Sequence, residues 1–560
     1  MKRLYYKYYP ILLILLALPL MLRSQESNLF PKAEKLALFT DRGIYISGEE
    51  VHFTAFVTNN AAQGLSYILY AEIIEPDGTK IIGGKFPLTH SSAHGCLTIP
   101  SESITGNYYL RVYTRYMRNL GPKSFAYVGL KIINPHKSDM LEGKDTLKIT
   151  SEENIEKPSG RILNISTDKA TYSLREESNV TVKTNSSKSG KILGLSISVI
   201  PEAAAPETMF NKDTAARKVD SVRFYSEIRG PSLTGVLRDS VTKKPEIGAR
   251  VNLSITGNRV DFLVTKTDRN GHFYFSLPSY SGNRDLFITP QNIPGKHPEI
   301  FVDNDFSTVP IDLPDPVFNL DSSEQSVAFH MAQNFWVRQL FYNDSVRCNK
   351  ETSKSAETLF IEPSYTLKLN KYIQLPTLEA YLDNLPSSVK VRKRHGRKYL
   401  KIVDLQPPMD SLDALVLVDG VAINDPEKIL ALSPTNISRI EVVNIPYKIG
   451  YMKYGGIVNI VSKKGDFAGI DLPSSGMFLN YAFLNDDCQC AITKPDSVNK
   501  PDTRNTLYWN PDVNLNSGKE LHFSFTTSDT PGNYVIILQG VYANGKLFMK
   551  KGIIVVKPKP

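Results

Sequence analysis

Short runs in which apolar and polar residues alternate recur along most of the 560-residue chain. Val51–Val57 and Tyr108–Tyr113 are two examples, and turn-forming residues such as those at 76–78 and 105–107 separate such runs. A period of two residues is typical of strands that bury one face. We therefore expect a mainly β protein that contains tandem β-sandwiches and one small α+β domain.

A short pattern near the N-terminus returns further along the chain with the same spacing. The first copy consists of Thr40, Asp41, Arg42, Tyr45 and Glu49, and the second of Thr167, Asp168, Lys169, Tyr172 and Glu176. Equal spacing predicts two copies of one sandwich, at 30–134 and at 161–228. The stretch between them, 135–160, is polar and is expected to be a linker.

The rest of the chain divides by pattern into further segments. We expect a third β-sandwich at 229–315, a helix within 320–345, an α+β domain at 363–470, a linker at 471–504 and a β domain at 505–560. Ser322 and Ser323 are candidate caps for the helix, and no glycine or proline follows until after Tyr342. Its apolar side chains, Trp336 among them, are expected to pack in a core.

Residues 1–24 have the layout of a signal peptide. Lys2, Arg3 and Lys7 precede an apolar run, Ile11–Leu22, that is shorter than the roughly 20 residues needed to cross a membrane. The mature chain is expected to begin near Gln25. Without the four basic residues of 1–24, the formal net charge falls from +9 to +5, which is too small to indicate a nucleic-acid partner.

The polar residues show no pattern of known catalytic chemistry. The nine histidines are scattered singly, without metal-ligand spacing. We expect no catalytic, cofactor-binding or metal-binding residues and no enzymatic activity. Cys96, two residues after His94, suits a buried strand position better than a nucleophile. The four cysteines, Cys96, Cys348, Cys488 and Cys490, allow three pairings between which the sequence does not decide.

The first repeat resembles a macroglobulin domain of the α2-macroglobulin type. The residues that carry this resemblance are Asp41, Arg42, Tyr45, Gly48 and Glu49. Two later segments, 506–512 and 528–529, are similar to pieces of a further macroglobulin domain. A covalent protease trap is not expected, because the sequence contains no Gly-Cys-Gly-Glu-Gln stretch. Asp41 and Arg42 are interpreted as an internal ion pair or turn contact, with a binding role as the alternative.

Two further segments resemble known modules. Residues from Ser232 to Phe273 are similar to the carboxypeptidase regulatory-like fold, which carries no active site. The α+β segment resembles the plug domain of TonB-dependent outer-membrane receptors. The residues that carry the second resemblance are Asp419, Gly420, Glu441, Tyr454, Gly455 and Gly456.

The position of the plug-like segment affects the expected role. Only 95 residues follow Gly465, whereas the strands of a receptor barrel need well over about 200. The segment is therefore expected to serve another molecule. The combination of modules resembles exported proteins of Bacteroidetes-type bacteria.

A dense cationic run lies within the plug-like segment. It consists of Lys390, Arg392, Lys393, Arg394, Arg397 and Lys398 around the turn His395-Gly396. We interpret it as the solvated face of a hairpin, with contact to an anionic surface as the alternative.

The expected function is that of a binding or assembly protein of the cell envelope. The expected location is the periplasm or the outer membrane. Its partners are expected to be outer-membrane or periplasmic proteins, with membrane association through a partner and an accessory role in TonB-dependent transport. No nucleic acid or cofactor is expected, and the oligomeric state stays open. The alternative is a macroglobulin-related, non-covalent protease inhibitor with its bait region at Glu142–Pro158.

Overall fold

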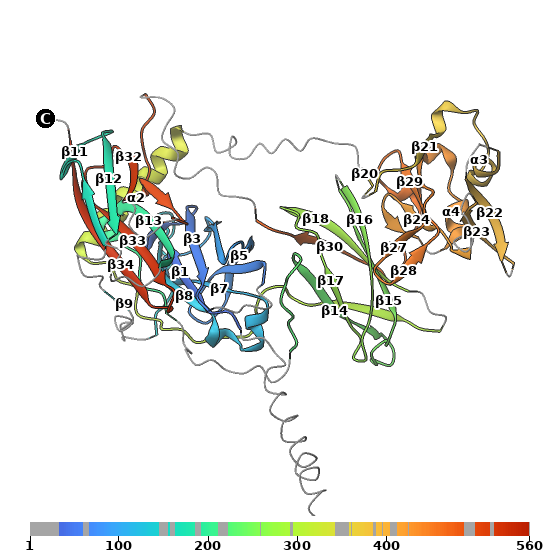
Figure 1. Cartoon of the computed structure of the whole chain (residues 1–560), viewed down its shortest axis with the longest axis horizontal. Helices are drawn as coiled ribbons and strands as arrows, with labels where there is room; N and C mark the ends of the chain where they lie inside the picture. Colours follow the sequence, from blue (N-terminus) through green and yellow to red (C-terminus); the bar gives the residue numbers. More distant parts are fainter. Residues whose placement is uncertain are drawn as a thin grey trace, which may run out of the picture. The chain divides into compact units, whose positions relative to one another are not determined.

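The chain forms two compact units (Figure 1). Unit 1 comprises 1–228, 306–344 and 487–560, and unit 2 comprises 229–305 and 345–486. The computed structural model describes residues 33–59, 66–144, 155–156, 163–184, 192–210, 222–257, 259–291, 295–341, 358–359, 361–384, 388–394, 396–403, 411–423, 425–485, 499–513, 515 and 520–558. The predicted signal peptide, 1–24, lies outside these residues. The mainly β class is confirmed, and none of the helices described is long and apolar enough to cross a membrane.

The first sandwich of unit 1 consists of two sheets. One sheet has the order β1 (Leu36–Thr40), β3 (Glu50–Val57), β6 (Ser92–Thr98). The other has the order β2 (Ile44–Ile46), β8 (Ala126–Ile133), β7 (Gly106–Tyr113), β4 (Ile68–Ile74), β5 (Lys80–Pro87). Strand β2 pairs with β8 in parallel, and the other pairs are antiparallel.

Strands β4 and β7 are buried along almost their whole length instead of on one face only. Two connecting segments of unit 1 cover the outer face of their sheet. Phe210 exchanges backbone hydrogen bonds with Tyr127, and the Phe306 ring packs edge-on against Tyr70. This cover encloses an ion pair, in which Arg111 Nε lies 2.7 Å from a carboxylate oxygen of Glu72.

The second sandwich repeats the topology of the first. Its small sheet has the order β10 (Leu163–Thr167), β12 (Glu177–Thr184), β32 (Glu520–Thr526). Its large sheet has the order β11 (Thr171–Ser173), β34 (Leu547–Lys557), β33 (Gly532–Tyr542), β13 (Ile192–Pro201), β31 (Tyr508–Asn510), with β9 (Ile155–Glu156) also on β34. The parallel pair β2–β8 recurs as β11–β34.

This second sandwich differs from the predicted division of the chain. The sequence placed 161–228 and 505–560 in separate domains, but β13 pairs with both β31 and β33. The four strands at 163–201 cannot bury both faces by themselves, so the C-terminal strands complete their core. Residues 202–507 are thus an insertion between the fourth and fifth strands of one sandwich.

Helix α2 (Ser322–Phe341) belongs to this insertion and packs in unit 1. Asp321, one residue before the expected caps, accepts hydrogen bonds from the amides of Ser323 and Glu324, both at 2.8 Å. The Glu324 carboxylate in turn accepts from the Asp321 amide, which completes a capping box. One face of the helix, with Met331 at its centre, packs on Ile44 and Ile46.

The apolar face that the sequence predicted is confirmed for Val327, Met331 and Phe335, which pack in this cluster. It is wrong for Trp336 and Leu340. Trp336 is 43% exposed and Leu340 is 80% exposed. The spacing identified the helix and part of its covered face, but not where that cover ends, because the segments that pack on α2 come from distant parts of the chain.

Unit 2 begins with a β-sandwich. One sheet has the order β17 (His272–Ser276), β14 (Ser232–Asp239), β19 (Pro298–Val302). The other has the order β20 (Thr358–Leu359), β16 (Arg259–Lys266), β15 (Arg250–Ile255), β18 (Asn283–Pro290), β30 (Met477–Ala482). Strand β30 lies in the predicted linker 471–504. It pairs with β18 because its apolar side chains Met477, Leu479 and Tyr481 complete the core of this sandwich.

The second part of unit 2 is the α+β domain. Its sheet has the order β21 (Tyr365–Lys368), β26 (Ile437–Val443), β29 (Ile457–Ser462), β24 (Leu415–Val418), β25 (Val421–Ala422). Two short helices, α3 (Leu378–Asn384) and α4 (Pro426–Leu430), accompany it. Two hairpins complete it, β22 (Val389–Arg394) with β23 (Arg397–Ile402) and β27 (Tyr447–Ile449) with β28 (Met452–Tyr454).

Truncation of one side chain in β33 tests whether the second sandwich is one cooperative body. Ile536 is fully buried opposite Val199, and Ile536→Ala should cost about 2–5 kcal/mol. Hydrogen exchange measured by mass spectrometry should speed up in 192–201 as well as in 532–557, and not in 229–305. Ile553→Ala, at a 60% exposed position of the same sheet, is the control and should change little. An effect of Ile536→Ala confined to 505–560 would instead support a separate C-terminal domain.

Candidate functional site

The motif residues of the first sandwich form a buried joint with the C-terminal part of the chain. Arg42 Nη2 lies 2.8 Å from Glu49 Oε2, and Arg42 Nη1 donates to Thr506 Oγ1 at 2.8 Å. The Thr506 hydroxyl donates to Asp41 Oδ2 at 2.6 Å. We call Asp41, Arg42, Tyr45, Glu49 and Thr506 the Arg42 joint. Asp41 and Arg42 thus lie inside unit 1 and not on a binding surface.

The electrostatics of the joint favour its charged form. Burial opposes the charge of Arg42, but Glu49 and Asp41 outweigh it and hold the pKa of Arg42 above its usual value. Burial and the Asp41 carboxylate raise the pKa of Tyr45 far above its usual value. Tyr45 therefore stays a neutral donor, and its hydroxyl donates to Asp41 Oδ1 at 2.7 Å.

Gly48 is required next to the joint for two reasons. Its φ is +94°, a conformation that residues with a Cβ rarely adopt. A Cβ at this position would also lie 2.9 Å from the ring of Phe335 on α2.

The second copy of the motif keeps the local contacts without the joint. Tyr172 donates to Asp168 Oδ1 at 2.8 Å, as Tyr45 does to Asp41. Lys169 and Glu176 form an ion pair that is largely exposed. The shared Asp–Tyr contact therefore holds the turn in both copies, whereas the buried cation bound to a C-terminal threonine hydroxyl is a feature of the first copy.

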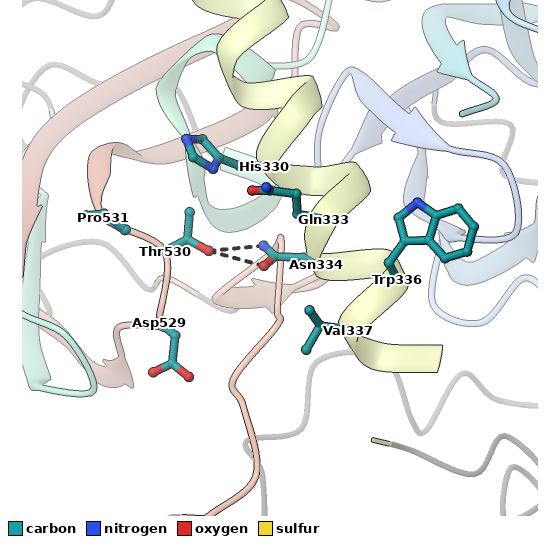
Figure 2. A pocket seen from close by; sticks show the side chains of 8 residues that line it. All are labelled: His330, Gln333, Asn334, Trp336, Val337, Asp529, Thr530 and Pro531. Carbon is teal, nitrogen blue, oxygen red and sulfur yellow. Dashed lines mark hydrogen bonds between the residues drawn. The ribbon is translucent and has the colours of Figure 1, made fainter. Parts of the chain in front are cut away.

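Hydrogen bonds continue from the joint to helix α2. Asn505 Nδ2 donates to Glu49 Oε1 at 2.7 Å. Asn334 Nδ2, on α2, donates to Asn505 Oδ1 at 2.9 Å and to Thr530 Oγ1 at 3.0 Å. Figure 2 shows Asn334 facing Thr530 of the β32–β33 loop. The helix is thus tied to the first sandwich and to the C-terminal strands together.

Two adjoining hollows lie along this side of α2, and Figure 2 shows the first of them. The first has a volume of about 480 Å³ and is lined by His330, Gln333, Asn334, Trp336, Val337, Asp529, Thr530 and Pro531. The second, of about 460 Å³, shares His330, Asn334, Thr530 and Pro531 and extends to Glu202, Arg504 and Tyr534. We call the two together the α2 groove.

The groove combines apolar surface with hydrogen-bonding groups. Trp336 packs against His136 with ring centroids 4.3 Å apart, so its ring is held in place although partly exposed. The side chains of His330 and Gln333 are exposed. Asp529 is neutralised by Arg175, with both contacts at 2.6 Å. This lining suits the recognition of a polypeptide through apolar contacts and amide hydrogen bonds.

A second cluster, Glu50, His52 and Cys96, has the residue types of a metal site. Their ligand atoms lie within 4.8 Å of one another, and burial lowers the pKa of His52. Cys96 is disulfide-bonded, however, and its sulfur is then no thiolate ligand. Glu50 and His52 are therefore the two groups of this cluster that can bind a metal ion well. The other three cysteines lie outside the described residues.

The predicted motif residues of unit 2 have structural roles at strand ends. Asp419, at φ +46°, and Gly420, at φ +79°, form the reversal between β24 and β25. The Asp419 carboxylate accepts from the amides of Ser462 and Phe467, at 2.7 and 2.9 Å. These contacts fix the end of β29 next to β24.

Glu441, Tyr454, Gly455 and Gly456 lie in the same domain. Glu441 accepts from Asn459 Nδ2 at 2.9 Å, and the ring of Tyr454 belongs to a core cluster. The Gly455 amide donates to the Asp413 carbonyl. At Gly456, where φ is +128°, a Cβ would lie 2.4 Å from a backbone oxygen. These residues belong to unit 2, whereas the Arg42 joint belongs to unit 1.

The sequence did not identify the α2 groove. Its lining comes from α2, from the β32–β33 loop and from residues after β13, which are hundreds of positions apart. The one available signal was the similarity of 506–512 and 528–529 to macroglobulin pieces, since both segments adjoin the groove.

Comparison with known proteins supports a macroglobulin-like first domain. A family model described as MG2 domain matches residues 35–126. No curated protein matches the chain.

Several solved structures show distant similarity. Native α2-macroglobulin from E. coli is 9% identical, with 94% of this chain and 40% of that chain covered and a TM-score of 0.24. Salmonella α2-macroglobulin reacted with methylamine is 10% identical, with coverages of 94% and 40% and a TM-score of 0.23. Latent PorU from Porphyromonas gingivalis is 10% identical, with coverages of 48% and 34% and a TM-score of 0.15. The chain thus spans about 40% of the length of these macroglobulins, and such TM-scores define no common arrangement of the whole chain.

The two copies of the motif allow a matched test of the joint. Arg42→Leu leaves Asp41 and Glu49 buried without their cation and should lower the free energy of unfolding by about 3–5 kcal/mol. Lys169→Leu removes the equivalent cation from an exposed ion pair and should hardly change the free energy of unfolding. Urea unfolding followed by tryptophan fluorescence measures both, because Trp336 and Trp509 both belong to unit 1. Equal losses in the two variants would contradict a special role of the joint.

Proposed function

We propose that this chain is an exported, non-enzymatic binding protein whose α2 groove takes up a segment of a partner polypeptide. Export is supported by the signal-peptide layout of 1–24 and by the disulfide of Cys96, since such bonds persist in oxidising compartments.

The observation that carries this proposal is the way the groove is fixed. Asn334 hydrogen-bonds two segments of the C-terminal region, so both walls of the groove are held before a ligand arrives. A preformed site costs less ordering entropy on binding. Trp336 supplies an aromatic anchor, the residue type that dominates binding energy in many interfaces.

The sequence of unit 2 supports the proposed location of the protein in the cell. Its two domains carry the patterns of a carboxypeptidase regulatory-like domain and of a TonB-dependent receptor plug. We infer a place in the periplasm or at the outer membrane of a Bacteroidetes-type cell, in contact with an outer-membrane protein and as an accessory to TonB-dependent transport. The Asp419-Gly420 reversal and the covered end of β29 support a plug-like domain.

Photo-crosslinking tests whether the groove binds a polypeptide. A photoreactive phenylalanine analogue at Gln333, which lines the groove, should give a discrete protein adduct in cells that express the chain. The same analogue at Gln339, exposed on α2 but not among the lining residues, is the matched control and should give none.

A second variant links the adduct to the groove itself. Val337→Asp places a charge in the apolar lining and should abolish the Gln333 adduct without lowering the unfolding midpoint by more than a surface substitution does. Adducts of equal yield at both positions, or an adduct insensitive to Val337→Asp, would rule the groove out as the binding site.

The alternative function is non-covalent inhibition of proteases, favoured by the MG2 match. Of its candidate bait region, Glu142–Pro158, only 142–144 and 155–156 are among the described residues. If this function holds, a protease incubated with the chain should cleave Glu142–Pro158. It should then digest a large protein substrate more slowly while its rate on a small peptide substrate stays the same. Unchanged digestion of the protein substrate after complete cleavage of the bait would eliminate this function.

A further inference from the structure

The β22–β23 hairpin separates apolar from cationic side chains. Val389, Leu400 and Ile402 point into the core of the α+β domain, where they are buried. Because successive side chains of a strand alternate between faces, Lys390 and Arg392 lie on the opposite face. Their cross-strand partners are Lys401 and Tyr399. The hairpin thus has one face fixed by packing and one face of basic and aromatic side chains.

Like charges stand directly opposite each other in this hairpin. Lys390 is paired in register with Lys401, and Lys393 with Lys398. Such pairs destabilise a hairpin by themselves. The two strands form a sheet of their own, and no other strand of the described residues pairs with them.

Three of the cations have partners within the domain, and two of these partners are carboxylates. Lys390 Nζ donates to the carbonyls of Leu382 and Asp383 at the end of α3, at 3.1 and 3.2 Å. Arg394 forms an ion pair with Asp413 at 3.0 Å, and Lys398 with Glu379.

Besides Lys390, three cations have no carboxylate partner among the described residues: Arg392, Lys393 and Lys401. Arg392 is held only by the Val391 carbonyl, at 3.2 Å. Arg392 and Lys393 are exposed and Lys401 is partly so. Arg392 and Lys401 lie on the face opposite the core, whereas Lys393, paired with Lys398, lies on the core-facing side next to the turn. Together they give the hairpin a net positive surface that the fold does not use.

We propose that this hairpin docks the chain on a membrane surface rich in anionic phospholipid. The charges lie on a hairpin surface without a described cavity, and neighbouring side chains of one face are about 7 Å apart along a strand. Such spacing suits the separate phosphates of lipid headgroups better than one acidic group in a pocket. Tyr399, within the cationic face, has an amphipathic ring suited to the headgroup region. This docking does not involve the α2 groove.

Vesicle co-sedimentation of the full mature chain tests the proposal. The chain should pellet with vesicles that contain phosphatidylglycerol at low salt, and much less with pure phosphatidylcholine or at high salt. The triple variant R392Q, K393Q, K401Q should bind phosphatidylglycerol vesicles about 100-fold more weakly, since each cation contributes about a factor of five.

Two further variants control for charge and folding. K448Q, K453Q, K464Q removes three exposed lysines of the same domain, with the same change of net charge, and should bind like the unmodified chain. The charge-conserving variant R392K, K393R, K401R should also keep its binding. If the neutralised triple falls below both, the loss comes from the charge of the hairpin.

Three results would overturn the proposal. One is equal binding by the hairpin triple variant and the lysine control. Another is equal binding to phosphatidylcholine and phosphatidylglycerol vesicles. The third is that soluble polyglutamate, matched in total charge, displaces the chain from the vesicles as effectively as added phosphatidylglycerol vesicles do. The hairpin would then be an acceptor for acidic polypeptides.

Discussion

The buried contact of Arg42 with Glu49 and Thr506 is the interaction on which unit 1 depends. It joins a turn of the first sandwich to Thr506, which lies directly before the strands that complete the second sandwich. A charge buried this deeply costs several kcal/mol unless every partner is in place. The stability of the first sandwich therefore depends on whether the C-terminal strands have folded, although hundreds of residues separate the two.

The insertion of 202–507 into the second sandwich explains several features together. Strand β13 pairs with β31 and β33, which lie far later in the chain, and such long-range pairing slows folding. The same insertion contributes α2, so the groove forms only when both sandwiches are complete. Asn334 links α2 to the C-terminal segments, because its side-chain amide donates hydrogen bonds to both Asn505 and Thr530.

Much of the local structure could be predicted from the sequence, and the long-range pairing could not. Alternation indicated the strands, and the repeated Asp–Tyr spacing indicated two sandwiches of one kind. The local sequence of β13 does not specify that it pairs with β31 and β33, because the backbone hydrogen-bonding groups at the edge of any apolar strand are the same. The exposure of Trp336 was missed for a related reason: helical periodicity shows which residues share a face, and not whether another segment covers it.

A double-mutant cycle at Arg42 and Thr506 tests the central claim most directly. If the joint couples the first sandwich to the C-terminal strands, the effects of Arg42→Leu and Thr506→Val on the free energy of unfolding should be non-additive by about 1–3 kcal/mol. Effects that add within about 0.5 kcal/mol would show that the two residues act independently, and would contradict a joint that unites unit 1.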